Sequence, residues 1–309
     1  MKPIYRVSLY FLIILVLSII APMITTRFFQ TMGLSIPVIL ILNHILIFIV
    51  PAIIYILAVN GNAKKILSLN KISSKDVLKA ILIGFLVQPI MNFLAYFSNL
   101  FFNNDVATFM EQTKNTPLWL MILVIGVTPA ITEEITIRGI VLSGYEYKNK
   151  NIAAVMSGLM FGMLHLNAGQ FLYAFAIGIL FAYMVRATGS IYVSMITHFT
   201  INTTQLLMGR FLTATTNSAE ISNSIDIMNS VPFIFHIVLL IFQFSIAVVF
   251  TFLVMWIIRG MEKSNKRIYL DDLDIDTKLS YKNESIINFP FILSVGVFLI
   301  YTVVTTIIL

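Results

Sequence analysis

Long apolar segments recur along the whole chain, separated by short polar ones. Several runs contain no Asp, Glu, Lys or Arg, and at most one histidine each: 7–26, 28–63, 80–104, 151–185, 187–209, 227–258 and 285–309. A helix needs roughly 20 apolar residues to cross a hydrocarbon core of about 30 Å. The pattern predicts transmembrane helices over residues 8–26, 36–59, 80–102, 118–143, 152–166, 170–187, 191–209, 232–258 and 289–308.

The composition agrees with this pattern. The 309 residues are 59% hydrophobic and only 11% charged, and the mean hydropathy is +0.93. One soluble core cannot hide so much apolar surface, so a bilayer must be the solvent. No internal repeat or separate soluble region is evident. We expect an all-α, polytopic transmembrane helical bundle of about 8–9 spans, forming one membrane domain over residues 1–309.

The distribution of basic residues predicts the orientation. If the N-terminus is cytoplasmic, all but Arg27, Lys114 and Arg210 of the twenty Lys and Arg residues fall on the cytoplasmic side. Nine spans then place the C-terminus on the opposite side. The formal charge of +6 reflects this bias and does not indicate nucleic-acid binding. The sequence predicts a multi-pass protein of the cell membrane with a cytoplasmic N-terminus.

The longest polar segment runs from Arg259 to Asn288 and contains an acidic stretch from Asp271 to Asp276. A calcium-binding loop is one interpretation. The glycine turn and the distal Glu of an EF-hand are absent, so we interpret the segment as a solvated cytoplasmic loop.

Charged residues also occur within the fourth predicted span, where Glu133, Glu134 and Arg138 follow an uncharged stretch. Ionisable side chains inside a bilayer are costly and usually face a bundle interior or a wet cavity. Glu134 and Arg138 are four residues apart and can pair, while Glu133 points about 100° away. We expect Glu133 to lack a local cation and to be available for proton transfer or for a ligand. Alternatively, the cluster is an interfacial helix end from which Arg138 extends towards water.

Two later spans contribute histidines. His165 ends the sequence from Phe161 to His165, and His198 lies four residues before Asn202, so that His198 and Asn202 share one helical face. With Glu133, these side chains supply a base, an acid and oxyanion donors from three helices. His165 lies about 21 Å along its helix, so this helix must tilt, begin late or border a wet cavity to reach the other residues.

Other features of the membrane helices have structural interpretations. A lone intramembrane histidine usually makes an interhelical hydrogen bond. We assign His44 and His236 to that class, because neither has a polar companion one turn away that suggests a site. Gly158 and Gly162 form a small-xxx-small face that indicates close helix packing.

At these residues the sequence resembles the CPBP family, the CAAX proteases and bacteriocin-processing enzymes also called Abi proteins, which includes the Ras-converting CAAX endopeptidase. The family pattern is EExxxR, FxxxH and HxxxN or HxxxD on separate transmembrane helices. The matching residues are Glu133, Glu134, Arg138, Phe161, His165, His198 and Asn202. The resemblance covers mainly residues 118–209, which we expect to form the catalytic core. The resemblance implies a core of eight helices, so the ninth predicted span is either an addition or a counting error.

The resemblance implies an intramembrane endopeptidase. In that family's terms, Glu133 and His165 activate water, His198 and Asn202 hold the oxyanion, and Glu134, Arg138 and Phe161 support them. The absence of cysteine excludes a thiol nucleophile. Family members have also been described as metalloproteases. Zn²⁺ held by Glu133, His165 and His198 is therefore an alternative to a mechanism without a cofactor, which we favour.

Different classes of function fit the same motifs. A protease would act on a membrane-associated peptide or protein, such as a prenylated tail, a bacteriocin leader or a pheromone precursor. A non-catalytic scaffold that regulates a partner such as a sensor kinase would keep the motifs as structural polar contacts, but it would not need Glu133 beside the Glu134–Arg138 pair. A proton-coupled transporter would also use buried Glu and His, but no inverted repeat or broken helix is evident in the sequence.

Overall fold

The computed structural model describes residues 1–102, 113, 115–215, 231–265 and 275–307. Helix α1 (Pro3–Thr31) forms the first span, and α2 (Ile36–His44), the π-helix η1 (Ile45–Ile49) and α3 (Val50–Ala58) form the second. A short helix, α4 (Ala63–Ile66), precedes α5 (Ser74–Leu86) and α6 (Gln88–Asn99). The fourth span consists of α8 (Leu118–Met121), η2 (Ile122–Val127), α9 (Thr128–Glu134), η3 (Ile135–Val141) and α10 (Leu142–Gly144).

The second half of the chain is equally helical. It contains α11 (Lys150–Leu164), α12 (Ala168–Thr188), α13 (Tyr192–Thr215), α15 (Phe233–Ser264), α16 (Ile275–Lys282) and α17 (Phe289–Ile307). All the elements of the described residues are helices, which confirms the predicted all-α fold. The helix bounds lie within six residues of those of the predicted spans.

Seven helices of the described residues are long and apolar enough to cross a membrane. Two of the nine predicted spans are not among them. Helix α11 has only 15 residues, and the 24-residue α13 carries His198, Asn202 and several threonines that lower its hydropathy. The protein is a multi-pass helical membrane bundle, and the two helices that differ from simple spans carry candidate site residues.

Two segments differ from the pattern read in the sequence. The third span is interrupted at Val87, between α5 and α6. Pro89 explains the break, because proline lacks the amide proton of a helical hydrogen bond and its ring collides with the preceding turn. The segment expected to be a loop after Arg259 contains the end of α15 and all of α16. In the acidic stretch of that segment, the residues from Asp271 to Asp274 lie outside the described residues.

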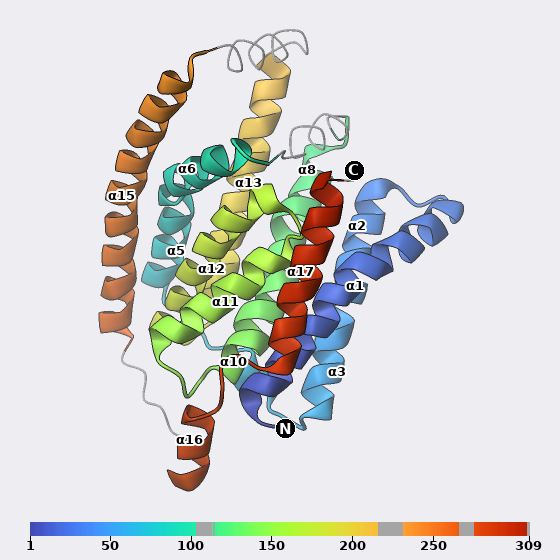
Figure 1. Ribbon diagram of the computed structural model, residues 1–309, viewed down its shortest axis with the longest axis vertical. Helices are drawn as coiled ribbons and strands as arrows, with labels where there is room; N and C mark the ends of the chain where they lie inside the picture. The colour runs from blue at the N-terminus through green and yellow to red at the C-terminus, as the bar shows by residue number, and fades with distance from the viewer. Residues whose placement is uncertain (103–112, 114, 216–230, 266–274, 308–309) are drawn as a thin grey trace.

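The helices differ in tilt. Figure 1 shows α11 and α12 oblique to α15 and α17, which run nearly along the long axis of the molecule. The tilt of α11 agrees with one of the three arrangements expected for this helix, which were a tilt, a late start or a position beside a wet cavity. The N-terminus and α16 lie at one end of the molecule, and the C-terminus lies towards the other (Figure 1).

Glycines determine how closely α11 and α12 approach. A Cβ on Gly178 would lie 2.6 Å from Cα of Gly158, and a Cβ on Gly158 would lie 2.8 Å from the carbonyl oxygen of Phe175. Gly162 packs against Phe171 in the same way. The two helices are therefore in backbone contact along the predicted small-xxx-small face.

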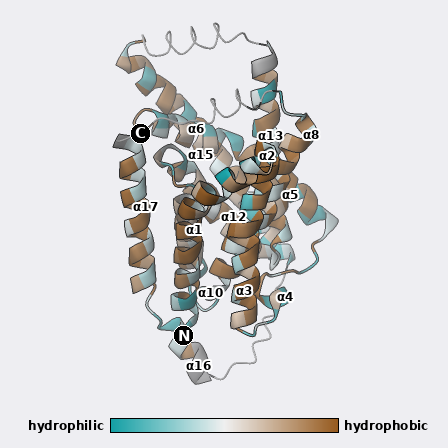
Figure 2. Ribbon diagram, turned by 90° about the vertical axis from the view of Figure 1, so that its right-hand side faces the viewer, coloured by the Kyte–Doolittle hydropathy of each residue, from teal (hydrophilic) through white to brown (hydrophobic). Residues whose placement is uncertain are grey.

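Hydrophobic residues dominate the outer surface of the bundle. Figure 2 shows them along the length of the helices, with hydrophilic residues mainly near the ends. Helix α15 is the clearest case, since only 11% of its most apolar window is buried within the protein. Such a helix is stable only where lipid covers its sides.

Candidate active site

The first part of the site is a buried ion pair in the fourth span. Nη1 of Arg138 donates to Oε1 of Glu134 at 2.8 Å, and neither side chain is exposed. The guanidinium lies 4.1 Å from the ring centroid of Phe161 and 4.9 Å from that of Phe181. Its Nη2 contacts the carbonyl oxygen of Gly178 at 3.4 Å. Both rings face the cation. The π-electrons of the rings, the Glu134 carboxylate and the Gly178 carbonyl thus take the place of the water that would otherwise solvate the guanidinium.

The burial of Arg138 decides between the two sequence interpretations of this cluster. Its exposed fraction is 1%, so the side chain does not extend to water, and the interpretation as an interfacial helix end is wrong. The helix geometry also departs from an ideal α-helix, because Arg138 lies in η3. Single π-helical turns are frequent at functional sites, where they shift side chains relative to a regular helix.

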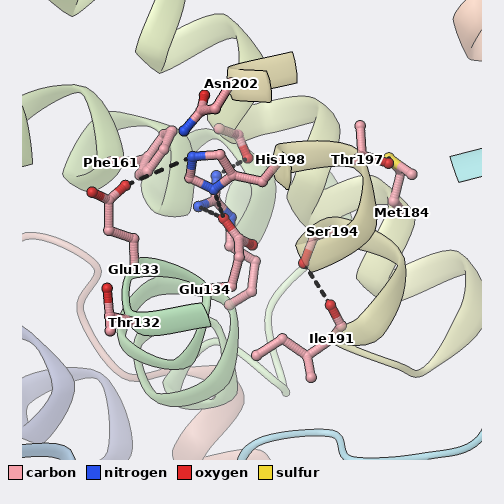
Figure 3. Close-up of polar contacts among 12 residues, drawn as sticks. Thr132, Glu133, Glu134, Phe161, Met184, Ile191, Ser194, Thr197, His198 and Asn202 are labelled. Carbon is pink, nitrogen blue, oxygen red and sulfur yellow. Dashed lines mark hydrogen bonds and ion pairs between the residues drawn. The ribbon is translucent and has the colours of Figure 1, made fainter. Parts of the chain in front are cut away.

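His198 on α13 lies between the two adjacent carboxylates (Figure 3). Its Nδ1 is 3.0 Å from Oε1 of Glu134, the same oxygen that accepts from Arg138. Its Nε2 is 4.0 Å from Oε2 of Glu133. A carboxylate oxygen accepts, so the contact with Glu134 places a proton on Nδ1 and directs Nε2 towards Glu133.

Glu133 and Glu134 occupy different environments although they are neighbours in sequence. The side chain of Glu134 has an exposed fraction of 0%, and that of Glu133 has 15%. The distance of 4.0 Å to His198 is too long for a hydrogen bond. Glu133 is therefore the more accessible of the two, as the helical spacing predicts.

His165 is the C-cap of α11 and also contacts Phe161. Its Nδ1 is 2.9 Å from the carbonyl oxygen of Phe161, which can only accept, so Nδ1 carries the proton and Nε2 has a free lone pair. The Phe161 ring meets His165 edge-on at a centroid distance of 4.9 Å and His198 at 5.8 Å. Phe161 thus contacts both imidazoles and the guanidinium of Arg138.

Asn202 lies one turn beyond His198 on α13. Its Nδ2 donates to the carbonyl oxygen of Ile125 at 2.9 Å. Ile125 belongs to η2, a π-helix of the fourth span. An amide nitrogen has two protons, so this bond fixes the orientation of Asn202 and leaves a second N–H for a ligand.

One histidine outside the three motifs, His44, makes the interhelical hydrogen bond that we expect of it, and this bond reaches the span that carries Glu133. Nδ1 of His44 lies 2.9 Å from Oγ1 of Thr132, the residue before Glu133. The two residues are 88 positions apart in sequence. Local spacing could not have revealed this contact, since it requires α2 and α9 to pack together. His236, by contrast, contacts the hydroxyl of Tyr96 at 2.7 Å, which agrees with an interhelical structural role.

The candidate metal ligands were Glu133, His165 and His198. Among the residues that the structure describes, no three His or acidic side chains are grouped so that they could hold one metal ion. Within the candidate set, Glu133 and His198 approach to 4.0 Å, and Nδ1 of His165 donates to the Phe161 carbonyl. The three candidate side chains therefore do not form a three-ligand metal site.

Comparisons with known proteins agree with the motif analysis. Residues 115–204 match the family model described as type II CAAX prenyl endopeptidase Rce1-like. The chain is 33% identical over 90 residues to the Bacillus subtilis protein named "Putative membrane peptidase YdiL". That alignment covers 29% of this chain and 37% of the relative. No solved structure matches.

The matched segment runs from just before α8 into α13 and contains all seven residues of the three motifs. It also contains the buried ion pair and both imidazoles described above. The resemblance is therefore confirmed over residues 115–204, which are similar to the Rce1-like type II CAAX prenyl endopeptidases.

Proposed function

We propose that this protein is an intramembrane endopeptidase that hydrolyses a peptide bond in a membrane-associated peptide or protein. Glu133 acts as the base that activates water, with His165 assisting it. His198 and Asn202 bind the oxyanion. The observation that carries the proposal is the position of His198, which lies 3.0 Å from the buried Glu134 and 4.0 Å from the more accessible Glu133.

The two carboxylates support two different roles. Glu134 is neutralised by Arg138 and accepts from Nδ1 of His198, so it orients the imidazole and stabilises a positive charge on it. Glu133 has no cation at hydrogen-bonding distance among the described residues and can accept a proton from water. A scaffold would need the first carboxylate but not the second.

The reaction follows from these positions. Glu133 takes a proton from water as the water oxygen bonds to the scissile carbonyl carbon, and the C=O electron pair moves to the carbonyl oxygen. That oxyanion accepts from Nε2–H of His198 and from the free N–H of Asn202. When the C=O bond re-forms, the C–N bond breaks and the amine takes the proton from Glu133. The products are a carboxylic acid and an amine.

The surroundings support a substrate that arrives from the bilayer. Glu133 lies near the middle of the apolar segment Leu118–Gly144. The helices that carry the site also present apolar side chains on their outer faces, among them Ile131 and Phe199, which are exposed on the protein surface.

We propose a location in the cell membrane with the N-terminus in the cytoplasm, because that arrangement puts most basic residues on the cytoplasmic side.

Comparative analysis of peptide termini tests the function. Membranes from cells that produce the wild-type protein, Glu133→Gln or Glu262→Gln are incubated, and the new N- and C-termini are labelled and sequenced. We expect matched pairs of termini in the wild type and in Glu262→Gln, whose carboxylate is on the surface, and none in Glu133→Gln. Identical termini in all three samples would refute the proposal. A biological effect that survives Glu133→Gln but not deletion of the protein would favour the scaffold.

A further inference from the structure

His44 makes a directed hydrogen bond to the helix that carries Glu133. Oγ1 of Thr132 donates its own proton to the carbonyl oxygen of Thr128 at 2.9 Å, so towards His44 it can only accept. Nδ1 of His44 is therefore the donor of the 2.9 Å contact. This assigns the tautomer of His44, with the proton on Nδ1 and the lone pair on Nε2.

Asn43, the residue before His44, bonds α2 to another helix, α1. Asn43 is buried and its Oδ1 accepts from the hydroxyl of Thr25 on α1 at 2.6 Å. Asn43 and His44 are consecutive and project in different directions, so α2 is bonded to α1 by one side chain and to α9 by the next. The end of α2 is thus hydrogen-bonded both to α1 and to α9, the helix that carries Glu133.

The bond ends next to the proposed base. Thr132 is buried and directly precedes Glu133, and Figure 3 shows the two side chains close together on α9. The turn that follows His44 is the π-helix η1, which packs against both α9 and η3. A shift of α9 relative to η1 would move Glu133 directly, and its distance of 4.0 Å to His198 is already at the limit of an ion pair.

We propose that His44 is a positioning residue for the hydrolysis: through Thr132 it holds α9 so that Glu133 remains within reach of His198 and of the attacking water. The inference rests on the proposed function. It gives His44 a role in the reaction that neither the three motifs nor the family resemblance assigns to it. His44 acts on the enzyme, not on the substrate, so its loss lowers kcat and leaves KM nearly unchanged.

The test uses the purified full-length protein in liposomes. The probe is a synthetic, internally quenched peptide that spans the most abundant Glu133-dependent cleavage site. We expect His44→Ala to lower kcat about ten-fold, because small displacements of a reacting group have large effects on rate. Thr132→Val should lower it by a similar factor. The double variant should be no slower than either single one, since both remove the same bond.

Two further variants separate positioning from simple destabilisation. The amide nitrogen of asparagine can replace Nδ1 of histidine, so His44→Asn should restore kcat to within about two-fold of the wild type. His236→Ala removes another histidine with an interhelical hydrogen bond and should leave kcat unchanged. If His44→Ala does not fold, the comparison of His44→Asn with Thr132→Val still decides the question.

Three results would overturn the inference. A wild-type kcat in Thr132→Val means that the hydrogen bond does not position the base. A loss in His44→Asn as large as in His44→Ala means that the imidazole itself is required. Additive losses in the double variant mean that His44 and Thr132 act independently. These results leave the proposed function intact, whereas the absence of any Glu133-dependent cleavage removes both proposals.

Discussion

Oε1 of Glu134 lies 2.8 Å from Nη1 of Arg138, and the same oxygen accepts from Nδ1 of His198 at 3.0 Å. One carboxylate oxygen therefore joins a fully buried cation on the same span to the imidazole of another helix. The orientation of His198 depends on Glu134, and the charge of Glu134 is tolerated inside the bundle because of Arg138.

Removal of Arg138 should destabilise the protein. Arg138→Met removes the buried cation that neutralises Glu134, and loss of one partner of a buried ion pair costs about 3–5 kcal/mol of the free energy of unfolding. Adding Glu134→Gln should restore most of this stability, because neither position of the original ion pair then carries a charge. The double variant should remain inactive, since an amide does not stabilise an imidazolium as a carboxylate does. Denaturant unfolding in mixed micelles and the cleavage assay measure the two effects.

Lys150→Met is the matched control for the substitutions in the buried Glu134–Arg138 pair. Lys150 pairs with Glu262 at 2.7 Å, but both side chains are about half exposed. Water screens such a pair, so its loss should change the free energy of unfolding by less than about 1 kcal/mol. An Arg138→Met variant as stable as Lys150→Met would contradict the role given to the buried pair.

Gly178→Ala tests the close approach of α11 and α12. The added Cβ would lie 2.6 Å from Cα of Gly158, a backbone atom that cannot move aside without separating the helices. We expect a loss of about 1–3 kcal/mol of stability. We also expect lower activity, because Phe161 and the Gly178 carbonyl, which surround Arg138, lie at this contact.

The control for this prediction is Gly296→Ala in α17. A Cβ there meets no atom within 4 Å, so the substitution should be neutral or stabilising by about 0.5–1 kcal/mol. Equal effects of the two substitutions on the thermal midpoint would show that the α11–α12 contact does not limit stability.

Glu284→Ala should destabilise the protein without altering the reaction. The Glu284 carboxylate is buried and accepts from the backbone N–H groups of Ile4 at 3.0 Å and Tyr5 at 2.8 Å. These are the first free amides of α1, whose N-cap residue Lys2 makes no side-chain cap. A negative charge at this position satisfies both donors and interacts favourably with the helix dipole.

The expected loss for Glu284→Ala is about 1–3 kcal/mol, the range for leaving buried donors unpaired. Glu284→Gln keeps one acceptor oxygen and should lose less. Both variants should cleave the probe peptide at the wild-type rate at temperatures where they remain folded. A wild-type thermal midpoint in Glu284→Ala would contradict the capping role.

Metal removal distinguishes the proposed mechanism from a zinc-dependent one. The protein is dialysed against a strong chelator in liposomes and then assayed with the probe peptide. We expect at least half of the wild-type rate to remain, because Glu133 activates water without a metal in this mechanism. Loss of the rate on chelation, with recovery on addition of Zn²⁺ alone, would show that a metal takes part.

The sequence by itself determined the helices and one pair of charges. Apolar runs such as 285–309 predicted the spans, because the thickness of the bilayer sets the length of each run. The separation of four residues predicted that Glu134 pairs with Arg138 and that Glu133 does not, because helix geometry alone decides which neighbours share a face. It also predicted the face through which α11 contacts α12, since only small residues allow that approach.

Only the tertiary structure decided which groups from different helices meet. The contacts of His198 with Glu134 and of His44 with Thr132 join residues 64 and 88 positions apart, and nothing in the local sequence encodes such pairings. The same holds for the burial of Arg138 between Phe161 and Phe181, and for the π-helical turns that carry Ile125 and Arg138. These features depend on how tilted helices pack, because packing energy is shared among many side chains and no single stretch of sequence specifies it.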